Sequence, residues 1–254
     1  MAKVQIEVCA SKANAKRLEE LGVPECRHIF LCDKDNGGID NLNPWYCEAT
    51  ALYWIWKKSK AKVVGLEHYR RFFVNRKGRF LPEDEILSIL KDNDIVLAEH
   101  YYDMTNNVFP RVAQSVVIGW GNRKFQAYKF IYGFLLHLAK TGMHDFAKFV
   151  MEDLYDEQTF YKCNMFISKK SVITEWCELM FPKVDEWLKE DGIKLDGSNL
   201  RLIGYVFEHL FGSWCKWRKL KIKVCDIVIY NKVLGAEEPA VFSNLRLLRK
   251  DVPH

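Results

Sequence analysis

Residues 41–73 read NLNPWYCEATALYWIWKKSKAKVVGLEHYRRFF, and this stretch decides how the rest of the chain is interpreted. Asn43 is a favourable N-cap residue and Pro44 a favourable first helical residue, so the pattern predicts a helix over residues 44–58. The apolar run at residues 62–66 predicts a short buried strand. Because ligands of open α/β sheets bind beyond the carboxyl ends of strands, the polar residues after this strand are candidates for a binding site.

Four such side chains follow the predicted strand in direct succession: His68, Tyr69, Arg70 and Arg71. Guanidinium groups keep their charge and offer paired donors to phosphate oxygens, so two arginines here suit a diphosphate. Adjacent residues of an extended chain point to opposite faces, so we expect only one arginine to face a ligand. The alternative is that both arginines pair with surface carboxylates and that His68 has a structural role.

Strand-like and helix-like segments alternate along the chain, which predicts an α/β fold with a mostly parallel sheet flanked by helices. The expected strands are residues 3–10, 27–32, 62–66, 94–98, 163–168 and 220–230, and the expected helices are 11–22, 44–58, 82–92, 122–140, 144–154, 172–190 and 199–217. Pro182 predicts an interruption of its helix. Since no linker or repeat divides the chain, we expect a single domain over residues 1–254, with a C-terminal tail at about 231–254.

The composition fits a globular chain and narrows the class of partner. The 254 residues are 49% hydrophobic, enough for a sizeable core. The formal net charge of +5 suits a phosphorylated small molecule or an anionic membrane surface, and it is too weak to indicate nucleic acid. The aromatic content of 14% suits a sugar-binding groove, a protein interface or a membrane-surface patch.

The cysteine pattern and the chain start indicate a cytoplasmic location. The eight cysteines are scattered without a CxxC pair, as is typical of reduced thiols in a cytosolic protein. The chain begins directly with a strand-like segment, so we expect no signal peptide, and no apolar run reaches the length of a membrane span. A cytoplasmic protein of this kind can also contact the inner face of the membrane peripherally, and this alternative stays open.

The stretch also carries the pattern N-x-x-Y-C-E-x-T-A-L-Y-W-x-W-K followed by G-L-x-H-Y-R-R. The matching positions are Asn43, Tyr46, Cys47, Glu48, Thr50, Ala51, Leu52, Tyr53, Trp54, Trp56 and Lys57, then Gly65, Leu66, His68, Tyr69, Arg70 and Arg71. This pattern resembles a bacterial family of capsular and exopolysaccharide biosynthesis proteins, first catalogued as a domain of unknown function, that includes galactofuranosyltransferase-like enzymes. The N-M-F-I run at residues 164–167 and the R-x-x-G-x-x-x-E pattern at residues 201–208 resemble further family motifs. The chain departs from the family pattern at Ser11-Lys12, where His-Lys is common, and at Glu67, where a small or apolar residue is usual.

The resemblance implies a glycosyltransferase with a GT-A-like, Rossmann-type fold, a hexosyltransferase of EC 2.4 type. Its expected donor is a nucleotide-diphosphate sugar, a UDP-sugar above all, and galactofuranose is one candidate sugar. The expected acceptor is a glycan or lipid-linked molecule in surface polysaccharide synthesis, and the expected stereochemical course is inversion. The alternative is a non-catalytic glycan-binding or phosphate-binding module on the same scaffold.

The resemblance also suggests roles for individual residues. An inverting transferase needs a carboxylate to deprotonate the acceptor hydroxyl; Glu208 is the first candidate and Asp196 the second. Glu208 can instead form an ion pair with Arg201 on the same helix, and Asp40 and Asn41 can instead belong to a solvated turn. The expected substrate-binding residues are Lys12, Asp40, Asn41, Glu48, His68, Tyr69, Arg70, Arg71, Asn164 and Arg201.

Enzymes of the GT-A-like class usually hold a metal and the sugar diphosphate with an Asp-x-Asp motif at a strand end. The equivalent place here is Glu67-His68-Tyr69-Arg70, which has no aspartate pair. One hypothesis is that arginine replaces the metal as the cation that stabilises the departing diphosphate. The other is that Glu67 and His68 bind a divalent cation, Mn²⁺ or Mg²⁺. We favour the version without a metal.

Overall fold

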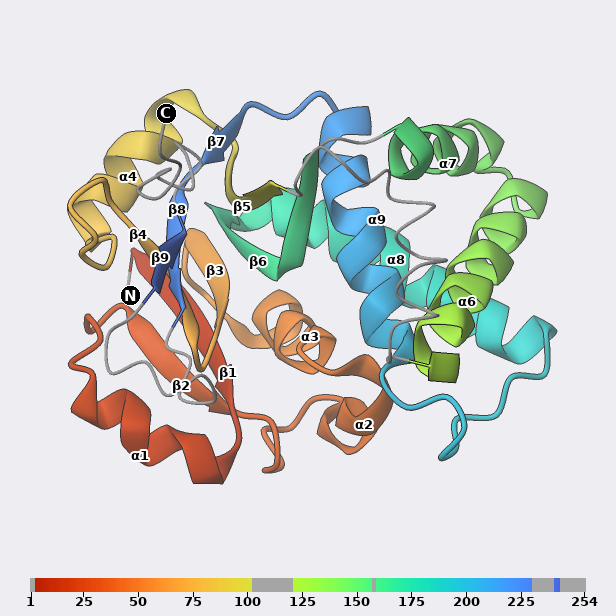
Figure 1. The fold of residues 1–254 in the computed structure, drawn as a ribbon, viewed down its shortest axis with the longest axis horizontal. Coiled ribbons are helices and arrows are strands. Elements are labelled where there is room, and N and C mark those ends of the chain that lie inside the picture. Colours follow the sequence, from red (N-terminus) through yellow and green to blue (C-terminus); the bar gives the residue numbers. More distant parts are fainter. Residues whose placement is uncertain (1–2, 102–120, 157–158, 230–239, 243–254) are drawn as a thin grey trace, which may run out of the picture.

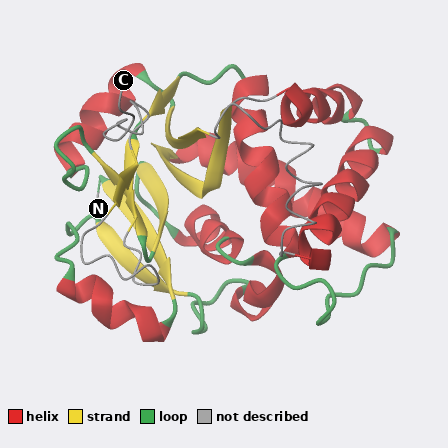
Figure 2. Cartoon of the chain, in the orientation of Figure 1, coloured by secondary structure: helices red, strands yellow, loops and turns green. Residues whose placement is uncertain are grey.

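The computed structural model describes residues 3–101, 121–156, 159–229 and 240–242. Strands gather on one side of the molecule and the long helices α6 to α9 on the other, as Figure 2 shows. The strands are β1 Val4–Ala10, β2 Arg27–Leu31, β3 Val63–His68, β4 Arg71–Val74, β5 Ile95–Tyr101, β6 Thr159–Lys169, β7 Ile222–Val224, β8 Asp226–Ile229 and β9 Ala240–Phe242. The helices are α1 Lys12–Glu20, η1 Asp40–Leu42, α2 Asn43–Tyr46, α3 Ala49–Lys58, α4 Glu83–Asp92, α6 Gly121–Lys140, α7 His144–Asp156, α8 Lys170–Glu190 and α9 Leu202–Trp217.

All described strands belong to one sheet, so the predicted α/β class, with helices around a central sheet, is confirmed (Figure 1). The strands β2, β1 and β3 are parallel neighbours, and β7 is parallel to β5. The strand β6 runs antiparallel between β3 and β5, and β4, β8 and β9 extend the sheet by antiparallel pairs. The sheet is therefore mixed, with its parallel part where the first three strands meet.

Apolar side chains of the central strands alternate between two cores because successive side chains point to opposite faces. In β3, Val63 packs into a core with α4, whereas its neighbour Val64 packs into the core with α3, α8 and α9. In the second core, the ring centroid of Trp176 lies 5.2 Å from that of Trp214 and 5.4 Å from that of Phe211. Much of the aromatic content thus fills the core, and it fixes α8 and α9 against the sheet.

The stretch at residues 41–73 differs from its prediction in two places. The helix expected over residues 44–58 is split into α2 and α3 because Cys47 has a φ of 50° and a ψ of −131°. Asn43 is the first residue of α2, and its amide donates to the carbonyl of Cys47 (3.0 Å) and the hydroxyl of Thr50 (3.2 Å). Secondly, residues 68–71 form the turn of a β-hairpin, since His68 of β3 pairs with Arg71 of β4.

Three further expectations are corrected. Pro182 lies inside α8 without interrupting it. The strand expected over residues 220–230 is two short strands, β7 and β8, which pair with different neighbours. Within the expected tail, Ala240–Phe242 forms β9 and pairs with β8, while the other tail residues lie outside the described part of the chain.

Candidate functional site

The candidate site lies where the parallel strands β1, β2 and β3 end. Their carboxyl ends share one edge of the sheet, and α1, α2 and α3 lie beside it, toward the lower side of Figure 1. The backbone N–H of Lys12 at the start of α1 donates to both carboxylate oxygens of Asp33, which follows β2 (3.1 and 3.0 Å). This contact joins the chain segments after β1 and β2. The edge has the position at which open α/β sheets bind ligands.

Glu48 occupies the centre of the site, at the junction between α2 and α3. The side-chain amide of Asn164 in β6 donates to its Oε1 at 3.0 Å. Burial raises the pKa of Glu48, and the hydrogen bond from Asn164 and the positive charges of Arg201 and Arg71 act against that rise. Residues from four segments far apart in the sequence therefore interact at one carboxyl group, Asn164 through a hydrogen bond and the two arginines through their charges. All four residues belong to the predicted substrate-binding set.

Arg201 joins α9 to α2 at this site. Its backbone N–H donates to the carbonyl of Pro44 at 2.9 Å, and its φ of 69° lies in the left-handed region. Its guanidinium group donates to the thiol of Cys47 and lies 5.9 Å from the ring centroid of Tyr205. The helix α9 can approach Cys47 closely because residue 204 is glycine: a Cβ there would lie 3.1 Å from the Cβ of Cys47.

Glu208 faces the same cluster from α9. Residues 205 and 208 are three apart in α9 and so share one face of that helix, and Arg201 is the residue directly before it. The negative charge of Glu208 raises the pKa of both Cys47 and Tyr205, after the larger effect of burial in each case. The first-choice carboxylate therefore lies near the cluster around Glu48.

Asp196, the second choice, has different surroundings. It is exposed in the loop before α9, and its carboxylate accepts from the backbone N–H (2.7 Å) and the hydroxyl (2.6 Å) of Ser198. These hydrogen bonds lower the pKa of Asp196, which makes it a weaker proton acceptor. Its backbone carbonyl accepts from the indole of Trp45 at 2.8 Å, so the loop packs beside α2.

The two adjacent arginines of the hairpin have different neighbours. The charge of Arg71 acts on Glu48, whereas the guanidinium of Arg70 lies 5.7 Å from the ring centroid of Tyr69. The backbone N–H of Tyr69 donates to the carbonyl of Cys9 at 3.0 Å, which ties the hairpin to the end of β1. Both arginines and His68 are partly exposed.

The sequence expectation that Glu67 can bind a metal is corrected by the contacts of its carboxylate. Arg27 donates from Nε to Oε2 (2.7 Å) and from Nη2 to Oε1 (3.0 Å), and the backbone N–H of Phe73 donates to Oε1 (2.9 Å). Both side chains of the ion pair are completely buried. The residues at this strand end therefore do not fit a Mn²⁺ or Mg²⁺ ion held by Glu67 and His68.

The loop that carries Asp40 and Asn41, two of the expected substrate-binding residues, is held by its own contacts. The carboxylate of Asp40 accepts from the backbone N–H groups of Asn36 and Gly38 (both 3.0 Å) and from the Asn36 amide (2.7 Å). Burial raises the pKa of Asp40, but these hydrogen bonds outweigh it and leave the pKa lowered. Asn41 and the side chain of Lys12 are exposed. The structure thus gives Asp40 a turn-forming role and leaves Asn41 and Lys12 accessible.

Residues outside the predicted set of site residues complete the surroundings of Glu48. The thiols of Cys9 and Cys32 are hydrogen-bonded to each other at the ends of β1 and β2. This hydrogen bond raises the pKa of Cys9 and lowers the pKa of Cys32, and the charge of Glu48 has a smaller effect on each thiol. Burial raises the pKa of the Cys47 thiol to about 12. Tyr205 could have been found from its spacing of four residues after Arg201, whereas nothing in the sequence pairs Cys9 with Cys32.

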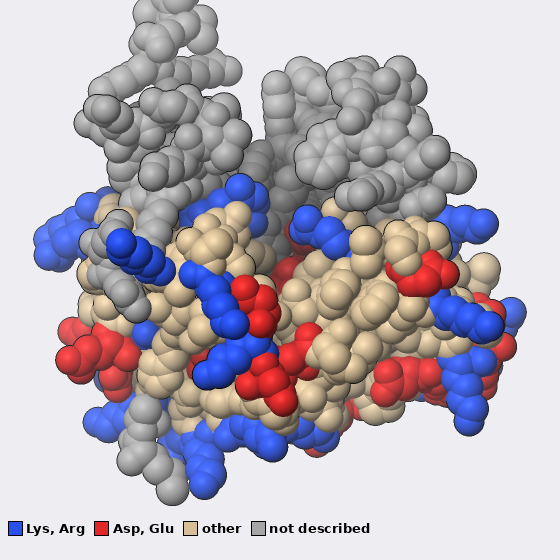
Figure 3. All heavy atoms as spheres, turned by 90° about the horizontal axis from the view of Figure 1, so that it is seen from below, with Lys and Arg blue, Asp and Glu red and all other residues tan. Residues whose placement is uncertain are grey.

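The surface around these elements carries charges of both signs. Figure 3, seen from below the view of Figure 1, shows basic and acidic side chains interspersed on the described part of this face. Such a surface suits local recognition of a small charged group. It is unlike the continuous basic stripe that binds nucleic acid.

The fold and the site define a GT-A-like α/β protein whose candidate binding residues lie beyond the ends of its parallel strands. The chain belongs to the family described as domain of unknown function DUF4422, which matches residues 19–219. It is also similar to a solved structure described as the apo form of the bifunctional glycosyltransferase WbbM, with a TM-score of 0.65 and 21% identity. That match covers 91% of this chain and 46% of the other, so this chain spans about half of that protein. No curated protein matches the chain.

Proposed function

We propose that this chain is a glycosyltransferase that moves a sugar from a nucleotide-diphosphate sugar to a glycan or lipid-linked acceptor. The observation that carries the proposal is that Asn164 hydrogen-bonds to Glu48 while the charges of Arg71 and Arg201 act on the same carboxyl group. Two guanidinium groups acting on one carboxyl group beside the strand ends suit a ligand that combines a diphosphate with hydroxyl groups. The glycosyltransferase title of the structural neighbour and the family resemblance of residues 43–71 agree with this reading.

In this proposal Arg71 and Arg201 bind the diphosphate and stabilise the charge that develops as the sugar leaves. Cations fixed in advance at that position lower the barrier because they need no reorganisation during the reaction. Glu48, held by Asn164, accepts a hydrogen bond from a sugar hydroxyl. Arg70 and Tyr69, side by side at the hairpin turn, form the rim, and His68, Lys12 and Asn41 contact the outer parts of the donor.

Glu208 is the proposed base that deprotonates the acceptor hydroxyl. Its charge acts on Cys47 and Tyr205, so it lies near the proposed diphosphate site, while Asp196 is already engaged by Ser198. A base on the opposite side of the sugar from the diphosphate gives inversion of the anomeric carbon. We therefore propose an inverting transfer with Glu208 as the base.

The finer assignments rest on the family resemblance. A UDP-sugar is the proposed donor, galactofuranose is one candidate sugar, and surface polysaccharide synthesis in the cytoplasm is the proposed setting. A lipid-linked acceptor would require the chain to approach the membrane from one side. In the described part of the chain, every helix is too short or too polar to cross a bilayer.

A panel of nucleotide sugars that includes UDP-galactofuranose tests the proposal. At least one member should raise the melting temperature and be hydrolysed slowly or transferred to an added glycan acceptor. Glu208→Gln should abolish transfer while donor binding persists, and Asp196→Asn should leave both intact. Donor binding without turnover, unaffected by Glu208→Gln, would instead indicate the non-catalytic binding module. The absence of any binding nucleotide sugar would contradict both.

A further inference from the structure

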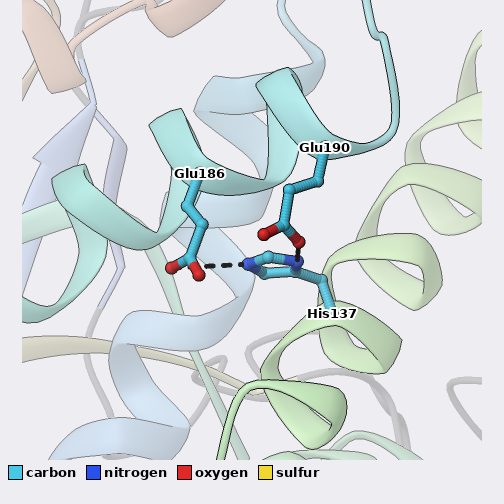
Figure 4. A group of neighbouring side chains, drawn as sticks. All are labelled: His137, Glu186 and Glu190. Atoms are coloured by element: carbon cyan, nitrogen blue, oxygen red, sulfur yellow. Dashed lines mark ion pairs between the residues drawn. The ribbon is translucent and has the colours of Figure 1, made fainter.

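A second polar cluster joins α6 to α8, away from the residues around Glu48. His137 lies near the end of α6, and Glu186 and Glu190 lie one turn apart on α8, as Figure 4 shows. The imidazole Nε2 is 3.9 Å from Oε2 of Glu186, and Nδ1 is 3.4 Å from Oε2 of Glu190. Among the residues that the structure describes, this is the one group of three His, Cys, Asp or Glu side chains with metal-ligand spacing.

The imidazole is buried, yet one of its nitrogens has no hydrogen-bond partner. The side chain of His137 is 4% exposed, and its Nε2 is a buried atom without a partner, pointed at Glu186 (Figure 4). A buried polar nitrogen without a partner costs about 1–3 kcal/mol. Such an atom therefore indicates that a group is missing from between Nε2 and the Glu186 carboxylate.

We propose that this cluster binds a divalent transition-metal cation, Zn²⁺ being the best match to its ligands. Nε2 of His137 and a carboxylate oxygen of Glu186 are the protein ligands, and water completes the coordination. Two ligand atoms each about 2.0–2.2 Å from one Zn²⁺ lie roughly 3–4 Å apart, which the present separation of 3.9 Å already satisfies.

Glu190 orients the imidazole in this site. Metal-bound histidines usually donate their other ring N–H to a carboxylate, which fixes the tautomer and makes the ligand nitrogen more basic. The Glu190 carboxylate faces Nδ1 as that arrangement requires. The ion links α6 to α8, and this inference does not rest on the proposed transferase activity.

Lys183 is the natural competitor for the ion. Its ammonium group lies 2.7 Å from Oε2 of Glu186 and lowers the pKa of that carboxyl group. A bound cation has to replace this contact. Because Glu186 and Glu190 are partly exposed, with 38% and 56% of their side-chain surfaces accessible, both can adjust around the fixed imidazole.

Calorimetric titration of the full chain with Zn²⁺ tests the site, and titration with Co²⁺ identifies the ligands. The absorption spectrum of Co²⁺ separates this nitrogen-and-oxygen site from thiolate ligands such as the Cys9–Cys32 pair. We expect one ion with a nitrogen-and-oxygen spectrum. His137→Phe and Glu186→Gln should lose that signal, and Glu190→Gln should weaken binding by about ten-fold or more.

Two further variants make the test specific. Glu178→Gln removes an exposed carboxylate from the same helix and should leave the affinity unchanged. Lys183→Ala removes the competing ammonium group and should tighten binding, which a merely structural ion pair does not explain. If Glu186→Gln folds and binds Co²⁺ with the affinity and spectrum of the unaltered chain, the proposal is overturned. It is equally overturned if the unaltered chain gives only a thiolate spectrum.

Discussion

At the scale of single residues, Arg70 and Arg71 look equivalent in the sequence but have different neighbours in the structure. The charge of Arg71 acts on Glu48, whereas the guanidinium of Arg70 lies beside the ring of Tyr69. A charge-assisted hydrogen bond contributes about 1.5–3 kcal/mol, so Arg71→Ala should weaken binding of the donor by about 10–100-fold. Arg70→Ala should have a smaller effect, and Lys77→Ala, an exposed cation near the same hairpin, none. Calorimetry with the best nucleotide sugar measures all three.

Equal losses for Arg70→Ala and Arg71→Ala would contradict the assignment of the diphosphate to Arg71. Circular dichroism spectra of the variants provide the control, because both arginines are partly exposed and neither substitution should disturb the core.

The buried pair of Arg27 and Glu67 gives a prediction about stability. Removing one partner leaves an uncompensated buried charge, so Glu67→Gln should lower the free energy of unfolding by about 3–5 kcal/mol. Denaturation by urea measures this loss. Glu67→Gln should not change the dependence of activity on Mn²⁺ or Mg²⁺, because the carboxylate is already engaged by Arg27 and Phe73. If Glu67→Gln is as stable as the unaltered chain but its activity no longer depends on Mn²⁺ or Mg²⁺, the assignment is wrong and Glu67 is a metal ligand.

Glu7 in β1 predicts a dependence of stability on pH. Burial raises its pKa from 4.5 to about 7, against the smaller effect of the hydrogen bond from Gln5. The folded state therefore binds the proton more tightly than the unfolded state, so this contribution to stability is full below pH 4.5 and is lost as the pH rises through about 7. The loss amounts to about 3 kcal/mol.

Glu7→Gln should remove this part of the pH profile. Chemical denaturation at several pH values should show the variant gaining stability relative to the unaltered chain between pH 5 and 8, since the neutral amide needs no proton. If the difference in stability between the two proteins stays constant from pH 5 to 8, Glu7 is already ionised in the folded state at pH 5, and the prediction is wrong.

The sequence selected candidate residues for the site but not the contacts between them. Glu48, Arg71, Asn164 and Arg201 came from the family resemblance, and the structure brings them together. The ion pair of Glu67 could not be predicted from the sequence, because its partner Arg27 lies 40 residues earlier in the chain. Only the packing of β2 beside β1 and β3 brings that partner close to Glu67.

At the scale of elements, the break between α2 and α3 is what presents Glu48 to the site. The residues around Cys47 favour a continuous helix, and the N-cap role predicted for Asn43 is wrong, because Leu42 is the N-cap of α2 and Asn43 its first residue. The positive φ of Cys47 accompanies a tertiary contact, the close approach of Gly204 in α9, and local propensity does not encode such a contact. A continuous helix over these residues would direct Glu48 differently.

Gly204→Ala tests this close approach. The added Cβ would lie 3.1 Å from the Cβ of Cys47 and 3.2 Å from the carbonyl oxygen of Tyr46, so α9 must shift from α2. We expect a loss of about 1–3 kcal/mol in the free energy of unfolding, together with weaker donor binding, because Arg201 moves with α9. Gly197→Ala, in the loop before α9 with no atom near the added Cβ, is the matched control. If Gly204→Ala leaves the donor affinity unchanged, the contact between α9 and α2 does not contribute to donor binding.

At the scale of the whole molecule, the alternation of strands and helices was sufficient to predict the α/β class. Which pairs of strands run antiparallel did not follow from the sequence, because the side-chain periodicity of a strand is the same whether its neighbours run parallel or antiparallel. The strand at residues 163–168 was predicted, but the antiparallel direction of β6, which carries Asn164 into the site, and the hairpin strand β4 are known from the structure alone.

The central claim is that the cluster around Glu48 receives the diphosphate of a nucleotide sugar. A crystal structure of the chain with the best-binding donor tests it most directly. We predict a diphosphate within hydrogen-bond distance of the guanidinium groups of Arg71 and Arg201, with the sugar beside Glu48 and the anomeric carbon accessible to Glu208. A well-ordered donor bound elsewhere, with neither arginine in contact with its phosphates, would contradict the claim.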